Sequence, residues 1–268
     1  MLGDDLVQEV LQAVNSASVP DGWNDTTIVM IPKVDNPEKV AQLQPISLCN
    51  FVYKVISKML ATRMKVVMPN VISDQQSAFV PERLITDNIL IAYECVHAIK
   101  RKKGKRGLCA VKLDMHKAYD RVEWGFLEKM MLKLGFDDRW VKLIMACVSS
   151  VRYPVRFNSM ETKMITPTRG IRQGDPLSPY LFLIVAKGLS SLIQQAEERG
   201  ELEGIKVCRE APMVYHLLFA DDSLILMHAD KSNADCLRGI LDMYCQGSGQ
   251  MLVQLNQVSF SRVIQRQM

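Results

Sequence analysis

Two adjacent carboxylates, Asp221 and Asp222, lie between two apolar runs at residues 215–219 and 223–227, a pattern that predicts the turn of a β-hairpin. A third carboxylate, Asp114, ends an earlier apolar run. Burying paired anions is costly unless a cation neutralises them, and carboxylate oxygens are ligands that Mg²⁺ prefers. Two such ions stabilise the attacking and leaving oxygens of phosphoryl transfer. The three acids therefore indicate a divalent-metal site, while the local pattern alone leaves an ordinary solvated turn open.

The elements that must position these acids are interleaved helices and strands. Apolar residues at helical spacing predict helices over residues 6–14, 51–68, 87–100, 124–134, 138–148, 177–198 and 233–244. Apolar runs bounded by turn residues predict strands at 27–31, 108–113, 151–157, 163–166 and in the hairpin 215–227. Asn50 is the predicted cap of the second helix and Pro69 its predicted end, and Gly135 is predicted to stop the fourth. Because the acidic hairpin is antiparallel, the pattern favours an α+β fold.

The composition is that of a globular protein that can bury a sizeable core. The chain has 268 residues, 48% of them hydrophobic, and no apolar run approaches the roughly 20 residues that span a bilayer. Its acidic first residues do not resemble a signal peptide. Seven cysteines without a C-x-x-C pair predict free thiols in a reducing intracellular compartment, either nucleus or cytoplasm. No membrane association and no obligate protein partner are expected.

A basic run precedes the strand that ends in Asp114. It consists of Lys100, Arg101, Lys102, Lys103, Lys105 and Arg106. The net charge of +4 is too small to identify a nucleic-acid-binding protein by itself. Two interpretations of the run stay open: a solvated loop, or a salt-sensitive, sequence-independent contact with a phosphate backbone.

The residues around the acids resemble the motifs of a known family. Residues 219–222 read Phe-Ala-Asp-Asp and are similar to the F/Y-x-D-D box of reverse transcriptases, and residues 114–122 resemble the first catalytic motif of that family. Further motifs match in order and spacing at residues 31–33, 45–48, 76–81 and 170–179. The combination is most similar to the reverse transcriptases of plant LINE-type (non-LTR) retrotransposons, and the resemblance covers nearly the whole chain.

This resemblance implies a right-hand polymerase made of palm and fingers, with an antiparallel palm sheet packed with helices. Residues 1–26 would be a helical extension and 27–268 the reverse transcriptase domain, with fingers mainly at 27–107 and palm mainly at 108–268. Because the sequence stops at residue 268, the resemblance also implies a truncated domain without its thumb. Neither an endonuclease before the polymerase nor a ribonuclease H after it is expected.

The resemblance assigns the chemistry to the three acids. Asp114 and Asp221 would bind two Mg²⁺ ions, with Mn²⁺ as a possible substitute, and Asp222 would support them. The bound ions would lower the pKa of the primer 3′-hydroxyl and neutralise charge on the α-phosphate. The alternative for Asp114 is a purely structural role, as a strand-end acid that caps the next helix.

Four further residues inherit roles in nucleotide binding. Tyr119 would exclude a ribose 2′-hydroxyl by steric clash, and Gln173 and Gly174 would contact nucleotide and template. Lys33 would lie near the incoming triphosphate. Without the family, Tyr119 would be a core aromatic residue, Gly174 a loop glycine and Lys33 a surface lysine.

The sequence also departs from the family pattern. Gln44 stands where arginine is usual, Glu82 where glycine is usual and Lys187 where glutamate is common. Gln254 and Gln257 replace an asparagine and a lysine, and the lysine is expected to protonate the leaving pyrophosphate.

Two functional hypotheses follow. The first is an RNA-directed DNA polymerase domain that uses an RNA template, a DNA primer, deoxynucleoside triphosphates and Mg²⁺. The second is a degenerate retrotransposon fragment that folds, binds nucleic acid and polymerises little or not at all. A metal-dependent phosphatase or nuclease has little support, because the four histidines form no metal-ligand pattern.

Overall fold

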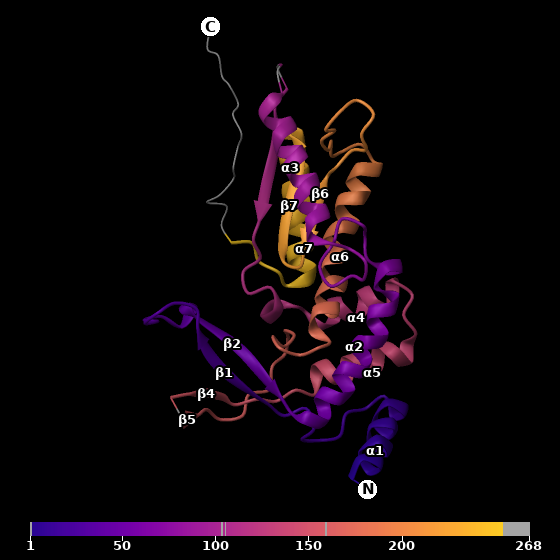
Figure 1. Cartoon of the computed structure of the whole chain (residues 1–268), viewed down its shortest axis with the longest axis vertical. Helices are drawn as coiled ribbons and strands as arrows, with labels where there is room; N and C mark the ends of the chain where they lie inside the picture. Colours follow the sequence, from indigo (N-terminus) through magenta and orange to yellow (C-terminus); the bar gives the residue numbers. More distant parts are fainter. Residues whose placement is uncertain (1, 103, 105, 159, 254–268) are drawn as a thin grey trace. The chain divides into compact units, whose positions relative to one another are not determined.

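A computed structural model describes residues 2–102, 104, 106–158 and 160–253 (Figure 1). The chain forms two compact units, and each unit is built from two separate stretches of sequence. The first unit comprises the residues up to Val67 together with Tyr119–Phe182. The second comprises Met68–Ala118 and the described residues from Leu183 onward. The assignment of 1–26 to an extension, 27–107 to fingers and 108–268 to palm stays a prediction.

Interleaved helices and strands make up both units, as the sequence predicts. The elements of the first unit are α1 (Leu2–Ser16), β1 (Thr26–Pro32), β2 (Leu43–Cys49), α4 (Trp124–Lys133), α5 (Asp138–Ser149), β4 (Val155–Phe157) and β5 (Met160–Glu161), with short 3₁₀ turns at Val40–Gln42 and Tyr119–Arg121. The elements of the second unit are α3 (Ile85–Arg101), β3 (Leu108–Leu113), β6 (His216–Phe219), β7 (Asp222–His228) and α7 (Lys231–Ser248). Two long helices, α2 (Phe51–Val71) and α6 (Ser178–Glu198), begin in the first unit and end in the second.

The sheet of the first unit has the strand order β2-β1-β4-β5. β1 is antiparallel to β2 and parallel to β4, and β4 and β5 form a short hairpin. The predicted return strand at 163–166 is wrong, because β5 is Met160–Glu161 and so begins close after the turn at Asn158, whose φ is +48°. Tyr153 and Ile165 still exchange two backbone hydrogen bonds, of 3.0 and 2.9 Å.

The sheet of the second unit has the order β3-β7-β6 and is antiparallel throughout (Figure 1). The antiparallel sheet predicted from the acidic hairpin is therefore confirmed. Helix α3 packs on one face of this sheet. The core between them contains Cys95 and Ile99 of the helix and Ala110, Leu217 and Leu226 of the strands.

The predicted helix boundaries are correct in two of three cases. The Asn50 side chain accepts a hydrogen bond from the Val52 N–H at 3.2 Å, as expected of a cap. Gly135 follows α4 with a φ of +87°, the left-handed conformation that ends many helices. Pro69 does not end α2, which runs on to Val71, because a proline in the last turn removes a single N–H donor.

Among the described residues, no helix combines the length and the apolar character that crossing a bilayer requires.

Candidate active site

The three predicted catalytic acids lie at one end of the sheet of the second unit. Asp114 directly follows β3, Asp221 lies in the turn between β6 and β7, and Asp222 is the first residue of β7. Leu113 pairs with Ser223 across the β3–β7 ladder, so the next step of the register brings Asp114 opposite Asp222. Strand pairing thus brings together acids that are far apart in the sequence.

These acids are exposed, which corrects one premise of the sequence argument. Asp114, Asp221 and Asp222 all reach solvent, and the Asp222 side chain is 59% accessible. Water therefore screens the charges, and the cost of burying paired anions does not apply. What remains is the mutual repulsion of three anions at one strand end, which a bound cation would relieve.

Lys112 is a member of this site that the sequence analysis missed. Its Nζ lies 3.0 Å from Asp222 Oδ1, in an ion pair whose two side chains are each about 60% exposed. The hydrogen bond to Asp222 and the charge of that carboxylate raise the pKa of Lys112, and Asp114 and Asp221 add to this effect. Lys112 precedes Asp114 by two residues, so both side chains leave the same face of the strand. This two-residue spacing along a predicted strand was the signal from which Lys112 could have been found.

The donor types fit a divalent metal, but the side chains have not converged. Within the part of the chain that the structure describes, no three His, Cys, Asp or Glu side chains are grouped closely enough to hold a metal ion. Asp222 is bonded to Lys112 instead. Asp114 and Asp221, whose carboxylates are hard oxygen ligands, are the residues that would hold such an ion.

The turn that carries Asp221 has a strained backbone. Phe219 pairs with Asp222, which leaves Ala220 and Asp221 as a two-residue hairpin loop. Ala220 has a φ of +54°, in the left-handed region. Hairpin loops of this length favour glycine or asparagine at positive φ, and an alanine there costs about 1–2 kcal/mol.

The side-chain amide of Gln76 bonds to this strained residue. Its Oε1 accepts the Ala220 N–H at 3.0 Å, and its Nε2 donates to the Ala220 carbonyl at 3.4 Å. Gln76 is 2% exposed. Gln76 begins the family motif at residues 76–81, and no contact between it and the acids was predicted from the sequence.

The segment around Gln76 lies along β6 and is tied down by a long-range network. The Leu218 N–H donates to the Gln75 carbonyl at 2.8 Å, and the Ser77 N–H donates to the Leu218 carbonyl at 3.2 Å. Arg83 donates to the carbonyls of Ser73 and Gln76 at 2.5 and 2.9 Å. Nearby, Glu82 has a φ of +65°, which agrees with the strain expected of a non-glycine residue at that position.

On the other side of Asp114, residues 251–253 run antiparallel to residues 114–116. The His116 N–H donates to the Met251 carbonyl at 2.7 Å, and the Val253 N–H donates to the Asp114 carbonyl at 2.9 Å. Gln254 and Gln257, the predicted replacements in the following motif, lie outside the described residues.

Burial shifts the pKa of two groups in the second unit, the buried His216 and the half-buried Lys187. Burial lowers the pKa of His216 to about 4, so its ring is neutral at pH 7, and its Nε2 lies 3.0 Å from Ser190 Oγ. Burial also lowers the pKa of Lys187, the residue found where glutamate is common. Lys187 Nζ donates to Ser73 Oγ at 2.8 Å.

The predicted nucleotide-binding residues Lys33, Tyr119, Gln173 and Gly174 belong to the first unit. The Ser47 N–H donates to the Gln173 carbonyl at 2.8 Å. Gly174 has a φ of +103°, and a Cβ there would lie 3.1 Å from the Ser47 carbonyl oxygen. This position therefore requires glycine for structural reasons, whatever else it contacts.

The other predicted contacts of the first unit are less decisive. Tyr119 is half-buried and stacks on Phe182, with 5.0 Å between ring centroids, so it also serves as a core aromatic residue. Lys33 is exposed. Gln44, found where arginine is usual, hydrogen-bonds through its side-chain amide to Gln173.

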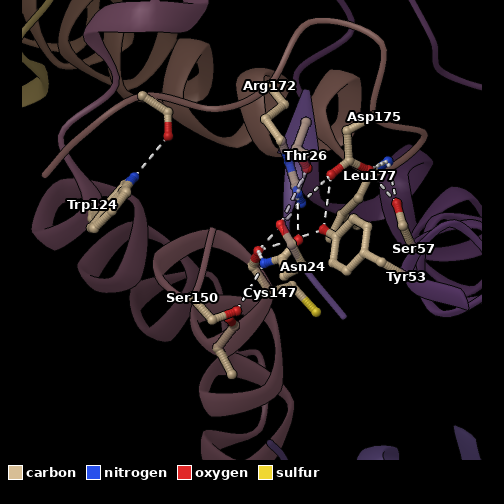
Figure 2. Close-up of polar contacts among 12 residues, drawn as sticks. Asn24, Thr26, Tyr53, Ser57, Trp124, Cys147, Ser150, Arg172, Asp175 and Leu177 are labelled. Atoms are coloured by element: carbon tan, nitrogen blue, oxygen red, sulfur yellow. Dashed lines mark hydrogen bonds and ion pairs between the residues drawn. The ribbon is translucent and has the colours of Figure 1, made fainter. Parts of the chain in front are cut away.

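The Gln173–Gly174 turn is flanked by a buried ion pair that sequence reasoning missed (Figure 2). Arg172 Nη2 lies 2.6 Å from Asp175 Oδ2, and both side chains are more than 90% buried. The Arg172 guanidinium stacks 4.1 Å from the centroid of the Tyr53 ring. An arginine and an aspartate three residues apart, on either side of Gln-Gly, were the available signal.

Further hydrogen bonds surround this ion pair (Figure 2). Asp175 accepts from the Tyr53 hydroxyl at 2.8 Å and from Ser57 Oγ. Arg172 donates to Asn24 Oδ1 and, at 3.2 Å, to Thr26 Oγ1. Burial, with a further contribution from the Asp175 charge, raises the pKa of Tyr53, so its hydroxyl keeps the proton that it donates.

The basic run is partly engaged in ion pairs. Arg106 lies 2.9 Å from both Glu203 and Asp230, so its charge is already balanced. Lys100, Arg101 and Lys102 are exposed. Lys103 and Lys105 lie outside the described residues.

Comparison with solved structures defines the class of fold. An apo telomerase from Candida tropicalis, truncated from its C-terminal domain, superposes with a TM-score of 0.56 at 12% identity, over 94% of this chain and 55% of that one. Telomerase from Candida albicans gives the same TM-score over 93% of this chain and 47% of that one. The α+β fold is therefore that of a right-hand polymerase, as predicted.

Comparison of sequences gives the family. Residues 31–255 match the model of the family "Reverse transcriptase (RNA-dependent DNA polymerase)". The chain belongs to this family.

Several curated relatives come from mobile elements. A 149 kDa protein of transposon TX1 from Xenopus laevis is 27% identical over 92% of this chain and 18% of that protein. The Pol polyprotein of a type-1 retrotransposable element R2 from Popillia japonica is 27% identical over 79% of this chain and 29% of that protein. An uncharacterized mitochondrial protein of Arabidopsis thaliana is 52% identical over 25% of this chain and 54% of that protein. The chain thus spans about half or less of the length of these relatives. The predicted non-LTR retrotransposon type is confirmed, and the plant origin stays a prediction.

Proposed function

We propose that this chain is an RNA-directed DNA polymerase domain that extends a DNA primer on an RNA template with deoxynucleoside triphosphates and divalent metal ions. The observation that carries the proposal is the meeting of Asp114, Asp221 and Asp222 at one end of the β3-β7-β6 sheet, in a chain of the reverse transcriptase family. The proposed origin of the domain in a retrotransposon is supported by the relatives named above.

Asp114 and Asp221 would hold two Mg²⁺ ions, or Mn²⁺ in their place. When bound, such ions lower the pKa of a primer hydroxyl and neutralise charge that develops on the α-phosphate. Asp222 has a supporting role, because its carboxylate is already paired with Lys112. The exposure of all three acids leaves them open to a primer end and a triphosphate.

The first unit would supply the nucleotide and template contacts. Tyr119 would reject ribonucleotides, Gln173 and Gly174 would contact the nascent base pair, and Lys33 would approach the triphosphate. The exposed Lys100, Arg101 and Lys102 would contact template or primer phosphates.

A degenerate fragment that retains nucleic-acid binding is the second candidate. One observation favours it: Gln44, which stands where a phosphate-binding arginine is usual, bonds to Gln173.

A primer-extension assay separates the two candidates. Purified protein is incubated with a DNA-primed RNA homopolymer, labelled deoxynucleotide and Mg²⁺, and compared with Asp221→Asn. We expect that variant to lose incorporation by about 100-fold or more, equivalent to about 2.7 kcal/mol in the activation barrier. Asp235→Asn, which makes the same change at an exposed position on α7, is the matched control and should keep full activity.

Two results would contradict the polymerase proposal. Equal incorporation by Asp221→Asn and the wild type would show that the site is assigned wrongly. Absent incorporation by a folded wild-type protein that still binds the primed template would favour the degenerate fragment.

A further inference from the structure

We infer that Gln76 is a positioning residue for the candidate metal site: its side-chain amide holds the Ala220–Asp221 turn in the conformation that presents Asp221. This inference rests on the proposed function only in taking Asp221 to be a metal ligand. The hydrogen bonds themselves are properties of the fold.

Ala220 is strained in this turn. With a φ of +54° it adopts a conformation in which a Cβ is crowded, and it occupies a hairpin loop of two residues. A loop of this kind relaxes to another conformation unless surrounding contacts fix it. The peptide between Ala220 and Asp221 sets the direction in which Asp221 leaves the turn.

The side chain of Gln76 matches the two backbone groups of Ala220. A glutamine amide offers an acceptor and a donor on one rigid plane. Its Oε1 accepts the Ala220 N–H at 3.0 Å and its Nε2 donates to the Ala220 carbonyl at 3.4 Å, so it binds both sides of one residue as a neighbouring strand would. Its Oε1 also accepts the Ala78 N–H at 3.0 Å.

Gln76 is itself held in place by its surroundings. Gln76 is almost completely buried, and Arg83 donates to the backbone carbonyl of Gln76 at 2.9 Å. Asn88 Nδ2 donates to the Leu218 carbonyl at 2.9 Å, which fixes the strand leading into the turn. A buried amide held in this way transmits a defined position to the turn without contacting a metal.

Glycine provides the discriminating experiment, because it adopts positive φ freely. Gln76→Met, Ala220→Gly and the double variant are compared with the wild type for Mn²⁺ affinity, with Asp221→Asn as the reference for loss of the site. We expect Gln76→Met to weaken Mn²⁺ binding by about 10-fold, a change of about 1.4 kcal/mol. Ala220→Gly alone should stay within about twofold of the wild type, and the double variant should regain most of the lost affinity because glycine no longer needs the clamp.

Hydrogen exchange at the Ala220 amide tests the clamp without any metal. The wild-type amide should be protected, and Gln76→Met should exchange at least about 10-fold faster. Gln76→Asn, which keeps both amide groups on a shorter arm, serves if Gln76→Met does not fold and should also speed exchange. Unchanged exchange in the folded variants, or lost Mn²⁺ affinity that glycine does not restore, would overturn the inference. A wild-type protein that binds no Mn²⁺ but shows the expected exchange would contradict the proposed function and leave the clamp standing.

Discussion

Two turns carry the candidate functional residues, and they are supported in opposite ways. In the first unit, the Gln173–Gly174 turn is flanked by a buried ion pair, Arg172–Asp175. In the second, the Ala220–Asp221 turn presents its charges to solvent and is held by the neutral amide of Gln76. The first turn uses charge for structure and exposes neutral groups, whereas the second uses neutral groups for structure and keeps its charges available for ligands.

Breaking the buried ion pair should have the largest effect. Arg172→Met leaves the Asp175 carboxylate buried without its cation, and we expect the free energy of unfolding to fall by about 3–5 kcal/mol in urea titrations. Arg156→Met breaks the exposed pair with Glu161 and should cost less than about 1 kcal/mol. Similar small losses for both variants would show that the buried pair does not support the first unit in the way described.

The buried, neutral His216 ring of the second unit predicts a pH effect of intermediate size. The unfolded His216 ring takes a proton below its ordinary pKa of roughly 6.5, whereas the folded ring resists protonation down to about pH 4. The unfolded state therefore binds more protons in this window, and stability falls as the pH is lowered through it. Between pH 7 and pH 5 we expect a loss of about 2 kcal/mol.

His216→Gln keeps a polar side chain but cannot titrate, so urea unfolding of this variant should depend less on pH between 7 and 5. His97→Gln, at an exposed position on α3, should keep the wild-type dependence. Identical pH profiles for the wild type and His216→Gln would mean that His216 is protonated in the folded protein or exposed to solvent.

The exposed charges of the second turn should matter least for stability. Lys112→Met removes a pair that is open to water, so the free energy of unfolding should change by less than about 1 kcal/mol. Mn²⁺ affinity should instead rise by about 5-fold, because about 1 kcal/mol of repulsion from a nearby cation is lost. Lys65→Met, on the exposed face of α2, should leave both quantities unchanged. Weaker Mn²⁺ binding in Lys112→Met would instead make Lys112 a support of the metal site.

The sequence predicts where the three acids lie in the fold, and it does not predict the contacts that support them. Asp114, Asp221 and Asp222 end or begin apolar runs, so both their strand positions and their motif are visible locally. Gln76 acts through bonds to a residue far away in the chain, and such bonds leave no local period to detect. The spacing of Arg172 and Asp175 is visible locally, but the burial of the pair and its bond to Asn24 depend on distant residues. The burial expected of the acids was wrong because a strand end faces water even when the strand itself is buried.

The two units are built from stretches of sequence that alternate along the chain, and this has a consequence for synthesis on the ribosome. A nascent chain that has emerged only as far as Ala118 contains part of each unit and completes neither. β3, an apolar strand, must wait for its neighbour β7 until more than one hundred further residues have been translated. An apolar strand left unpaired for that time is a template for aggregation, so chaperone binding should begin near Asp114 and end when β7 emerges.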